Sequence, residues 1–423
     1  MEAKKLFIQL IQAKTVNDDQ SEWAGINVLE NWMNECGLEY QVFESPQRRP
    51  NLVAKLLGTS GDSEKPPLIL LSHIDVVAAA EEEWTYPPFS GMEAENAIWG
   101  RGTLDTKQLT AMHAHAYYLL SKQKQRSRDV YFIVTSDEEN GSTEGMEFLV
   151  KEQPHLFEQA TVFSEGGGFL IEDQDNETSY MLYANSEKGV ATVRLSAKME
   201  GGHAAAPPDE SLILILLETT SQIASSIKPA HVNQDLVDFQ SKMNGMLESK
   251  RDSNDHQDLV QRFVDYMGQP SIKIPDFEIG SSSINVLPAK GEVTLEIRVL
   301  PQMTEGQIRD QLNHVVSHPK VLWELTSFEP GYQNTQDDLL IEIFKSTAED
   351  LGFYGEWVPF TALGRTDGRW VADSAASIYG ISPTLTNFTE VLKRVHQKDE
   401  RIEIDSFEFG SKWMDKAVAK ICE

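Results

Sequence analysis

Four short segments carry residue types that bind divalent metal ions and activate water. They are Ser72-His73-Ile74-Asp75, Gly100–Asp105, Ser136-Asp137-Glu138-Glu139 and Ser164-Glu165-Gly166-Gly167, with a single histidine, His396, far downstream. Imidazole and carboxylate groups are usual ligands of zinc, and this set is large enough for two ions. A lone His-x-Asp carries little information. The ordered series, however, indicates metal-assisted hydrolysis.

Apolar runs that predict strands precede these segments. The runs are 51–57, 67–72, 130–136 and 160–164, and helical patterns at 106–122 and 145–151 lie between them. This alternation favours an α/β fold with a parallel sheet. In such sheets the reactive residues lie beyond the carboxyl ends of the strands. His73, Glu138, Glu139 and Glu165 all occupy such positions.

The length of 423 residues predicts two domains. The pattern changes near Glu187. After this residue the sequence first predicts a strand at 190–197, a helix at 211–227 and a polar helical stretch at about 233–267. Strands at 283–287 and 292–299, a helix at 305–317 and a strand at 321–326 follow. This β-α-β-β-α-β order suits an inserted α+β domain at 188–328. The α/β pattern resumes with helices at 339–351 and from 406, so residues 1–187 and 329–423 form the first domain.

Composition limits the class of protein. Hydrophobic residues make up 40% and charged residues 24%, as in ordinary globular proteins. The net charge of −29, without a basic run, argues against nucleic-acid binding. No run is apolar enough for a membrane span, and the N-terminus reads as an amphipathic helix and not as a signal peptide. Cys36 and Cys422 are too few for a disulfide framework, so we expect a cytoplasmic location.

The sequence resembles the co-catalytic zinc metallopeptidases and deacylases (zinc metallopeptidase family twenty), which include aminoacylase, acetylornithine deacetylase, succinyl-diaminopimelate desuccinylase, glutamate carboxypeptidase and carboxypeptidase S. Besides the four segments, the resemblance is carried by Trp84–Gly91, Gly202-His203 with Pro207-Pro208, Asn285–Pro288, Arg298–Pro301, Thr366-Asp367 and the spacing of His396 and Glu400. The segments 102–105, 187–189 and 201–208 look most like the branch of carboxypeptidase S and the N-acyl amino acid hydrolases.

The resemblance implies a fold. A zinc-exopeptidase-like catalytic domain would have a mixed, mostly parallel sheet sandwiched by helices. The inserted domain would be ferredoxin-like and serve as a lid and dimerisation domain, so the resemblance implies a homodimer.

The resemblance also implies ligands for two zinc ions per chain, with cobalt or manganese as substitutes. Asp105 would bridge the ions, with His73 and Glu165 on one ion and Glu139 and His396 on the other. Asp75 would hold the imidazole of His73. Of the neighbouring glutamates, Glu138 would be the general base on the attacking water.

Substrate contacts are implied in the same way. His203 would stabilise the oxyanion, often in the active site of the partner subunit. Asn285 and Arg298 would together hold a free α-carboxylate, since the guanidinium group can bind it bidentately. Arg365, in a turn at 364–368, would contact substrate.

Three places depart from the family pattern without removing a ligand or the base. Gln108 replaces a glycine after the Asp-x-Lys segment, Ala204 and Ala205 stand where Ser-Ser is common, and Ala78 replaces a proline. His113 and His115 are two residues apart on a predicted helix, so they do not share a face. We expect no metal-binding role for them.

These observations favour a metal-dependent hydrolase that cleaves an amide or peptide bond next to a free α-carboxylate. Its small-molecule substrate would be an N-acyl amino acid or a short peptide, as for a deacylase, carboxypeptidase or dipeptidase. One alternative is a metal-binding relative without turnover that acts as a sensor or scaffold. Another is a single-metal amidohydrolase of a different fold, and the metal count would distinguish it.

Overall fold

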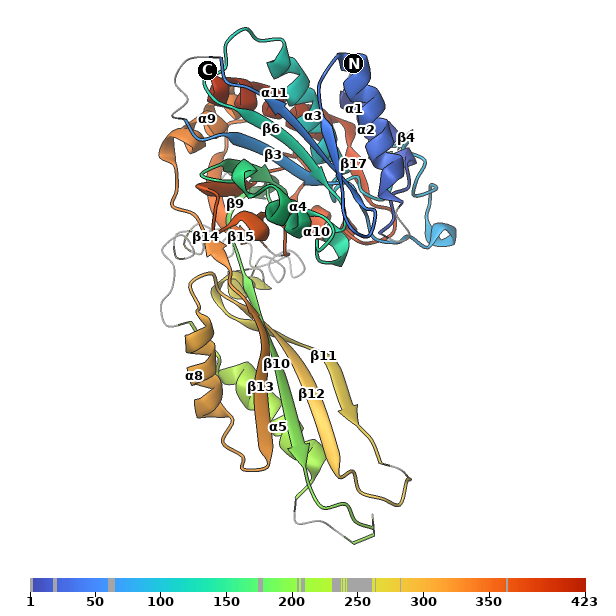
Figure 1. Cartoon of the computed structure of the whole chain (residues 1–423), viewed down its shortest axis with the longest axis vertical. Helices are drawn as coiled ribbons and strands as arrows, with labels where there is room; N and C mark the ends of the chain where they lie inside the picture. Colours follow the sequence, from blue (N-terminus) through green and yellow to red (C-terminus); the bar gives the residue numbers. More distant parts are fainter. Residues whose placement is uncertain are drawn as a thin grey trace. The chain divides into compact units, whose positions relative to one another are not determined.

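A computed structural model describes residues 3–17, 21–59, 65–173, 178–203, 205–206, 210–229, 264–281, 283–362 and 364–423, with positions 237, 239, 241, 261 and 262. The chain forms two compact units (Figure 1). Unit 1 comprises described residues of 1–185 and 334–423, and unit 2 comprises those of 186–247 and 257–333. Ala204, Pro207, Pro208 and most of the expected helical stretch at 233–267 lie outside the described residues.

Unit 1 is built on a mixed sheet whose centre is parallel. Its strands run in the order β1 (Gln41–Glu44), β2 (Pro50–Leu56), β6 (Val130–Thr135), β3 (Leu68–His73), β7 (Thr161–Ser164), β16 (Ser377–Gly380) and β9 (Thr178–Glu187), and β8 (Phe169–Asp173) and β15 (Glu356–Ala362) also pair with β9. The four central strands β6, β3, β7 and β16 are parallel to one another, whereas β1, β2, β8 and β9 pair antiparallel. Every residue of β3 and β6 is buried, as expected for parallel strands covered on both faces.

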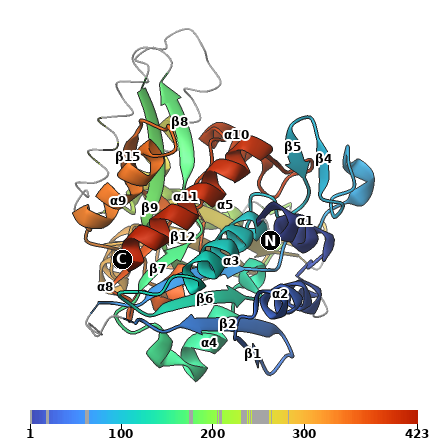
Figure 2. The same cartoon turned by 90° about the horizontal axis from the view of Figure 1, so that it is seen from above.

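Helices cover both faces of this sheet. The helices of unit 1 are α1 (Ala3–Gln12), α2 (Glu22–Cys36), α3 (Lys107–Ser121), α4 (Met146–Glu152), α9 (Asp338–Glu349), α10 (Phe388–Arg394) and α11 (Ile404–Cys422). Figure 2 shows α1, α3 and α11 on one face and α4 on the other. Buried aromatic rings join α9 to α11, where Phe344 and Trp413 lie 5.2 Å apart edge to face. The predicted α/β fold with a sheet between helices is confirmed.

Short elements connect the main ones. A three-stranded sheet has the order β17 (Arg401–Glu403), β5 (Ala97–Trp99) and β4 (Met92–Ala94). Single 3₁₀ turns are η1 (Glu81–Glu83), η2 (Glu138–Asn140), η3 (Pro154–Leu156) and η4 (Asp367–Val371). None of the helices in the described ranges combines the length and apolar character that crossing a membrane requires.

Unit 2 has the β-α-β-β-α-β order. Its elements are β10 (Gly189–Lys198), α5 (Leu212–Ser226), β11 (Ser271–Ile279), β12 (Lys290–Val299), α8 (Glu305–Val315) and β13 (Val321–Glu329), and a short strand β14 (Tyr332–Gln333) pairs with the last residues of β9. The four-stranded sheet has the order β11-β12-β10-β13 and is antiparallel throughout. Alternate residues of β10 and β12 point into a core shared with α5 and α8. The roles of lid and dimerisation domain stay predictions.

The prediction of a strand at 283–287 is wrong. Residues 283–287 form a turn with a single bridge between Val286 and His203, and the strand that pairs with β12 is β11. β11 contains Pro275, which argues against a strand in the interior of a sheet. β11 lies at the edge, however, where a missing N–H is tolerated, and its pairing with β12 is irregular beside the proline.

Candidate active site

Three of the five candidate ligands come from strand ends that meet at one edge of the unit 1 sheet. His73 is the last residue of β3, Glu139 lies in η2 after β6, and Glu165 directly follows β7. Since these three strands are parallel, their carboxyl ends lie together. Asp105 lies in the turn between β5 and α3. His396, with a left-handed φ of 60°, lies just beyond α10.

These five residues form two groups that share one carboxylate. In the first, Nε2 of His73 is 3.1 Å from Oδ1 of Asp105 and 3.1 Å from Oε2 of Glu165. In the second, Nε2 of His396 is 3.1 Å from Oδ2 of Asp105 and 3.2 Å from Oε2 of Glu139. Each group could hold a metal ion. Asp105 therefore presents one oxygen to each group, as a bridging ligand would.

The charges at the site are unbalanced. Burial and the nearby Asp105 and Asp367 raise the pKa of Glu165 to about 7, in spite of His73. Burial and the charge of Asp105 also raise the pKa of Glu139. Hydrogen bonds to Asp105 and Glu139 raise the pKa of His396 to about 10. Burial and carboxylate repulsion thus disfavour the ionised glutamates, and a bound cation would offset both effects.

The donor set fits a divalent cation. It offers two imidazole nitrogens and three carboxylates, which are ligand types that zinc accepts. Oε1 of Glu139 is buried and has no hydrogen-bond partner among the described residues. An unpaired buried carboxylate oxygen needs an explanation, and a metal ion would supply the missing partner.

Glu138 lies beside both groups but belongs to neither. Its side chain is 10% exposed, and Nη1 of Arg369 is 3.8 Å from its Oε1. Burial and the charges of Glu165, Asp367 and Asp105 raise the pKa of Glu138 well above its usual value. A carboxyl group that prefers to hold a proton at this position is suited to acid–base chemistry.

Asp75 has a wider structural role than the sequence suggested. Nδ1 of His73 is 3.0 Å from the backbone oxygen of Asp75 and 3.5 Å from its carboxylate, so the backbone makes the closer contact. The carboxylate also accepts hydrogen bonds from Nδ2 of Asn17 and from the backbone N–H groups of Glu138 and Glu139, at 2.6, 3.2 and 3.0 Å. A carboxylate has enough lone pairs for all of these contacts. Asp75 therefore also fixes the turn that carries the paired glutamates.

Glu400 joins the two chain segments that supply Asp105 and His396. It is fully buried, and its Oε2 accepts a hydrogen bond from Nη1 of Arg101 at 2.5 Å. Its Oε1 accepts the backbone N–H of Leu104 at 2.8 Å. The spacing of His396 and Glu400 was visible in the sequence, but the contact with Arg101 was not.

Asp367 supports the site from η4. Its carboxylate accepts hydrogen bonds from the hydroxyl groups of Thr135 and Ser142, both at 2.5 Å. The Thr366-Asp367 motif contributed to the resemblance, yet it gave no role for the carboxylate. Arg369, which faces Glu138, was missed because a single arginine in a turn carries no distinctive pattern.

The candidate substrate residues of unit 2 do not form one cluster. His203 and Asn285 are exposed and lie on adjacent segments, since His203 bridges to Val286. Arg298 lies near the far end of β12, where its Nε donates to Glu296 at 2.9 Å. From Lys290 to Arg298 the strand advances about 3.3 Å per residue, or about 26 Å in all. Asn285 and Arg298 of one chain therefore lie at opposite ends of β12, and their joint binding of a carboxylate stays a prediction.

Arg365, the remaining predicted contact, lies in unit 1. It is half-buried in the segment between β15 and η4, two residues before Asp367. Its contact with substrate stays a prediction.

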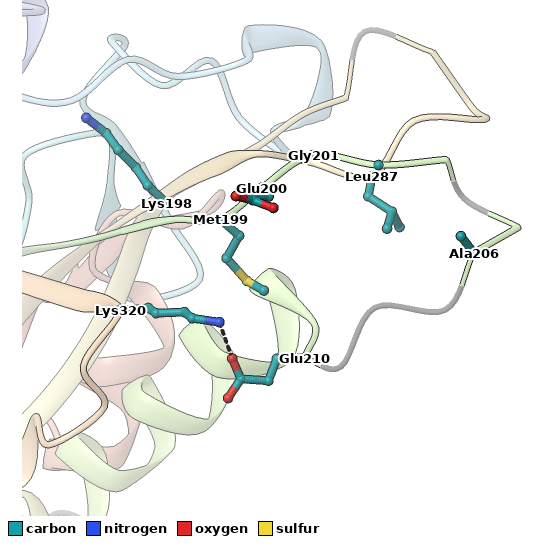
Figure 3. A pocket seen from close by; sticks show the side chains of 9 residues that line it. Lys198, Met199, Glu200, Gly201, Ala206, Glu210, Leu287 and Lys320 are labelled. Carbon is teal, nitrogen blue, oxygen red and sulfur yellow. Dashed lines mark hydrogen bonds and ion pairs between the residues drawn. The ribbon is translucent and has the colours of Figure 1, made fainter.

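A pocket of about 700 Å³ lies beside the His203 segment within unit 2 (Figure 3). It is lined by Lys198, Met199, Glu200, Gly201, Gly202, Ala206, Glu210, Leu287 and Lys320. An ion pair of 2.5 Å joins Lys320 to Glu210 across one side. Both candidate metal groups found among the described residues lie in unit 1, and none of their residues lines this pocket.

Comparison with known proteins decides the family. The model of peptidase family M20/M25/M40 matches residues 69–420. The chain belongs to this family. The human N-fatty-acyl-amino acid synthase/hydrolase PM20D1 is 29% identical over 380 residues, covering 84% of this chain and 74% of the human protein. The probable carboxypeptidase S-like 1 of Dictyostelium discoideum is 26% identical over 362 residues, covering 82% of this chain and 71% of its own.

A solved structure shows the same fold. The M20 family metallo-carboxypeptidase Sso-CP2 of Sulfolobus solfataricus has a TM-score of 0.67 with 16% identity, covering 99% of this chain and 98% of its own. The predicted family and fold are confirmed. The chain is thus a metal-dependent enzyme that hydrolyses amide or peptide bonds. The alternative of a metal-binding relative without turnover finds no support.

Proposed function

We propose that this enzyme uses two zinc ions to cleave the amide bond next to a free α-carboxylate. The substrate is an N-acyl amino acid or a short peptide cut at its C-terminus. The observation that carries the proposal is Asp105, whose two oxygens face two different histidine–carboxylate pairs. Relatives named for N-fatty-acyl-amino acids and for carboxypeptidase S support the substrate class.

In this proposal His73 and Glu165 hold one ion, Glu139 and His396 hold the other, and Asp105 binds both. When bound, such ions would lower the pKa of the attacking water and stabilise the negative charge that develops on the carbonyl oxygen. Zinc suits the nitrogen and oxygen donors. Cobalt or manganese could replace it, since such sites accept several divalent ions.

Glu138 is the general base in this scheme. It accepts a proton from the attacking water and later donates it to the leaving amine. Its carboxylate is not needed in either metal group, and Asp75 fixes the backbone of the turn that presents it.

The α-carboxylate and the oxyanion are bound by unit 2 in the proposal. Arg298 binds the carboxylate, and His203 and Asn285 contribute from a second chain of a homodimer. The separation of Asn285 from Arg298 along β12 supports two chains, because one chain does not gather these side chains. Arg365 is a further substrate contact.

A substrate screen tests the proposal. Purified enzyme with added zinc is offered N-acyl amino acids and dipeptides, and the released amine is measured. Matched substrates carry an amide in place of the α-carboxylate. We expect turnover of the free acids and at least about 100-fold lower kcat/KM for the blocked ones, because a site built for a charged group rejects an analogue that lacks it. Equal turnover of both sets would refute carboxylate recognition.

We also infer a cytoplasmic location. Both cysteines, Cys36 and Cys422, are free thiols, as is usual in a reducing compartment. Cell fractionation checks this inference, and recovery of the enzyme mainly from the medium would contradict it.

A further inference from the structure

An N-terminal segment lies directly against the candidate active site. Residues 15–17 run parallel to 74–76, with Val16 paired to Val76. The backbone N–H of Val76 donates to Thr15, and that of Asn17 donates to Val76, both at 2.9 Å. These contacts extend β3 beyond His73. They come from a part of the chain that precedes the matched family region, which starts at residue 69.

Asn17 connects this segment to Asp75. Its Nδ2 donates to Oδ2 of Asp75 at 2.6 Å, and its Oδ1 accepts a hydrogen bond from Nη1 of Arg49 at 3.0 Å. Oδ2 of Asp75 also accepts the backbone N–H of Glu139. The amide of Asn17 thus orients the carboxylate that holds the turn of the paired glutamates.

Arg49 holds the same turn from its other end. Its Nη1 pairs with the fully buried Glu22 and lies 3.4 Å from Oδ1 of Asp137. Asp137 directly precedes Glu138 and has a left-handed φ of 66°, a conformation that is uncommon for residues other than glycine. Its Oδ2 accepts the backbone N–H of Glu144 at 3.0 Å. Arg49 therefore contacts Asp137 directly and Asp75 through Asn17.

We propose that Asn17 and Arg49 are positioning residues that fix the backbone of the turn at 137–139. This turn carries Glu138 and Glu139, so it determines both the orientation of the base and the metal affinity. The inference rests on the proposed roles of Glu138 and Glu139. Arg49 places a charged donor next to the carboxylate of Asp137, and the amide of Asn17 donates to Asp75, whose carboxylate accepts backbone N–H groups of the turn. Together these contacts fix the backbone of the turn more firmly than solvent would. If Arg49 only neutralised Glu22, its loss would lower stability without changing metal affinity.

The test uses Asn17→Ala and Asn17→Asp in the full chain. The aspartate keeps the size but cannot donate to Asp75, and its charge repels that carboxylate. Zinc affinity is measured by competition with a chromophoric chelator, together with kcat, KM and Tm. We expect about a tenfold weaker zinc affinity and about a tenfold lower kcat at saturating zinc for Asn17→Ala, typical of residues behind metal ligands, with KM nearly unchanged. Asn17→Asp should lose at least as much zinc affinity and kcat as Asn17→Ala.

A double variant tests whether the two residues act together. Adding Asn17→Ala to Arg49→Met should weaken zinc binding little further than Arg49→Met alone, because both act on one turn. Additive losses would show independent effects and overturn the coupling. Should Arg49→Met fail to fold, the two Asn17 variants decide the proposal by themselves.

His115→Gln is the matched control. Nδ1 of His115 lies 3.0 Å from Oδ1 of Asp415, in a partly buried contact between α3 and α11 of the same unit. This variant should lower Tm without changing zinc affinity. Unchanged zinc affinity and kcat in both Asn17 variants, or an equal loss in His115→Gln, would overturn the inference. A wild-type enzyme that binds no zinc would instead overturn the proposed function.

Discussion

At the scale of single residues, Asp105 determines how the site is organised. Each of its oxygens lies 3.1 Å from a different imidazole nitrogen, and burial alone would raise its pKa. The hydrogen bonds from His396 and His73 lower that pKa instead. Asp105 is therefore ionised wherever the histidines face it, which a shared metal ligand requires.

The assignment of the base gives a prediction for Glu138→Gln. The amide keeps the size but cannot accept the proton of the attacking water, so kcat should fall by about 10²- to 10⁴-fold. Zinc affinity should stay within about twofold, because Glu138 is outside both metal groups. Steady-state kinetics and chelator competition measure these effects. Glu147→Gln, which removes a surface ion pair on α4, is the control. Wild-type turnover in Glu138→Gln would eliminate this residue as the base.

At the scale of elements, the buried Arg101–Glu400 pair connects the turn before α3 to the segment after α10. Glu400→Ala leaves a guanidinium group that is 3% exposed without its carboxylate. Breaking such a pair costs about 3–5 kcal/mol, so the free energy of unfolding should fall by that amount in urea titrations. The double variant Arg101→Met/Glu400→Leu should recover part of the loss. A cost below about 1 kcal/mol for Glu400→Ala would show that the pair is not important to the fold.

His113 in helix α3 makes the stability of the fold depend on pH. Both ring nitrogens are buried and have no hydrogen-bond partner among the described residues, and burial lowers the pKa of His113 to about 3. Below its ordinary pKa of 6.5 the unfolded chain binds a proton that the folded chain does not. The stability contributed by this group is therefore complete above pH 6.5 and is lost as the pH falls towards 3.

His113→Leu should remove this dependence. Relative to the wild type, the variant should gain about 2 kcal/mol in the free energy of unfolding between pH 7 and pH 5. Urea titrations at several pH values measure the gain, and His155→Leu, at an exposed position of η3, is the control. An identical pH dependence for wild type and His113→Leu would contradict the account.

The sequence predicted those parts of the site that depend on local pattern. The apolar runs of β3, β6 and β7 placed His73, Glu139 and Glu165 correctly after their strands. The sequence did not predict β11 because Pro275 argues against a strand in the interior of a sheet, whereas β11 lies at an edge. The contacts of Asn17 with Asp75 and of Arg49 with Asp137 join residues about 60 and 90 positions apart, and only tertiary packing, which no local pattern records, creates them.

At the scale of the whole molecule, the proposed dimer predicts complementation between two inactive chains. Glu138→Gln loses the base and His203→Ala loses the oxyanion contact. If His203 acts across the dimer, refolding an equal mixture should restore about a quarter of wild-type activity, since half of the dimers are mixed and each has one intact site. The released amine measures recovery. Absence of recovery, although light scattering shows mixed dimers, would place His203 in its own chain's site.

The most direct test of the account is the number of zinc ions that the chain binds. Dialysed protein is titrated with zinc and the bound metal is measured per chain. We expect about two ions for the wild type, about one for His396→Ala, and fewer than one for Asp105→Ala, because both sites share that carboxylate. A wild type that binds a single ion, or an Asp105→Ala variant that still binds two, would contradict a shared aspartate.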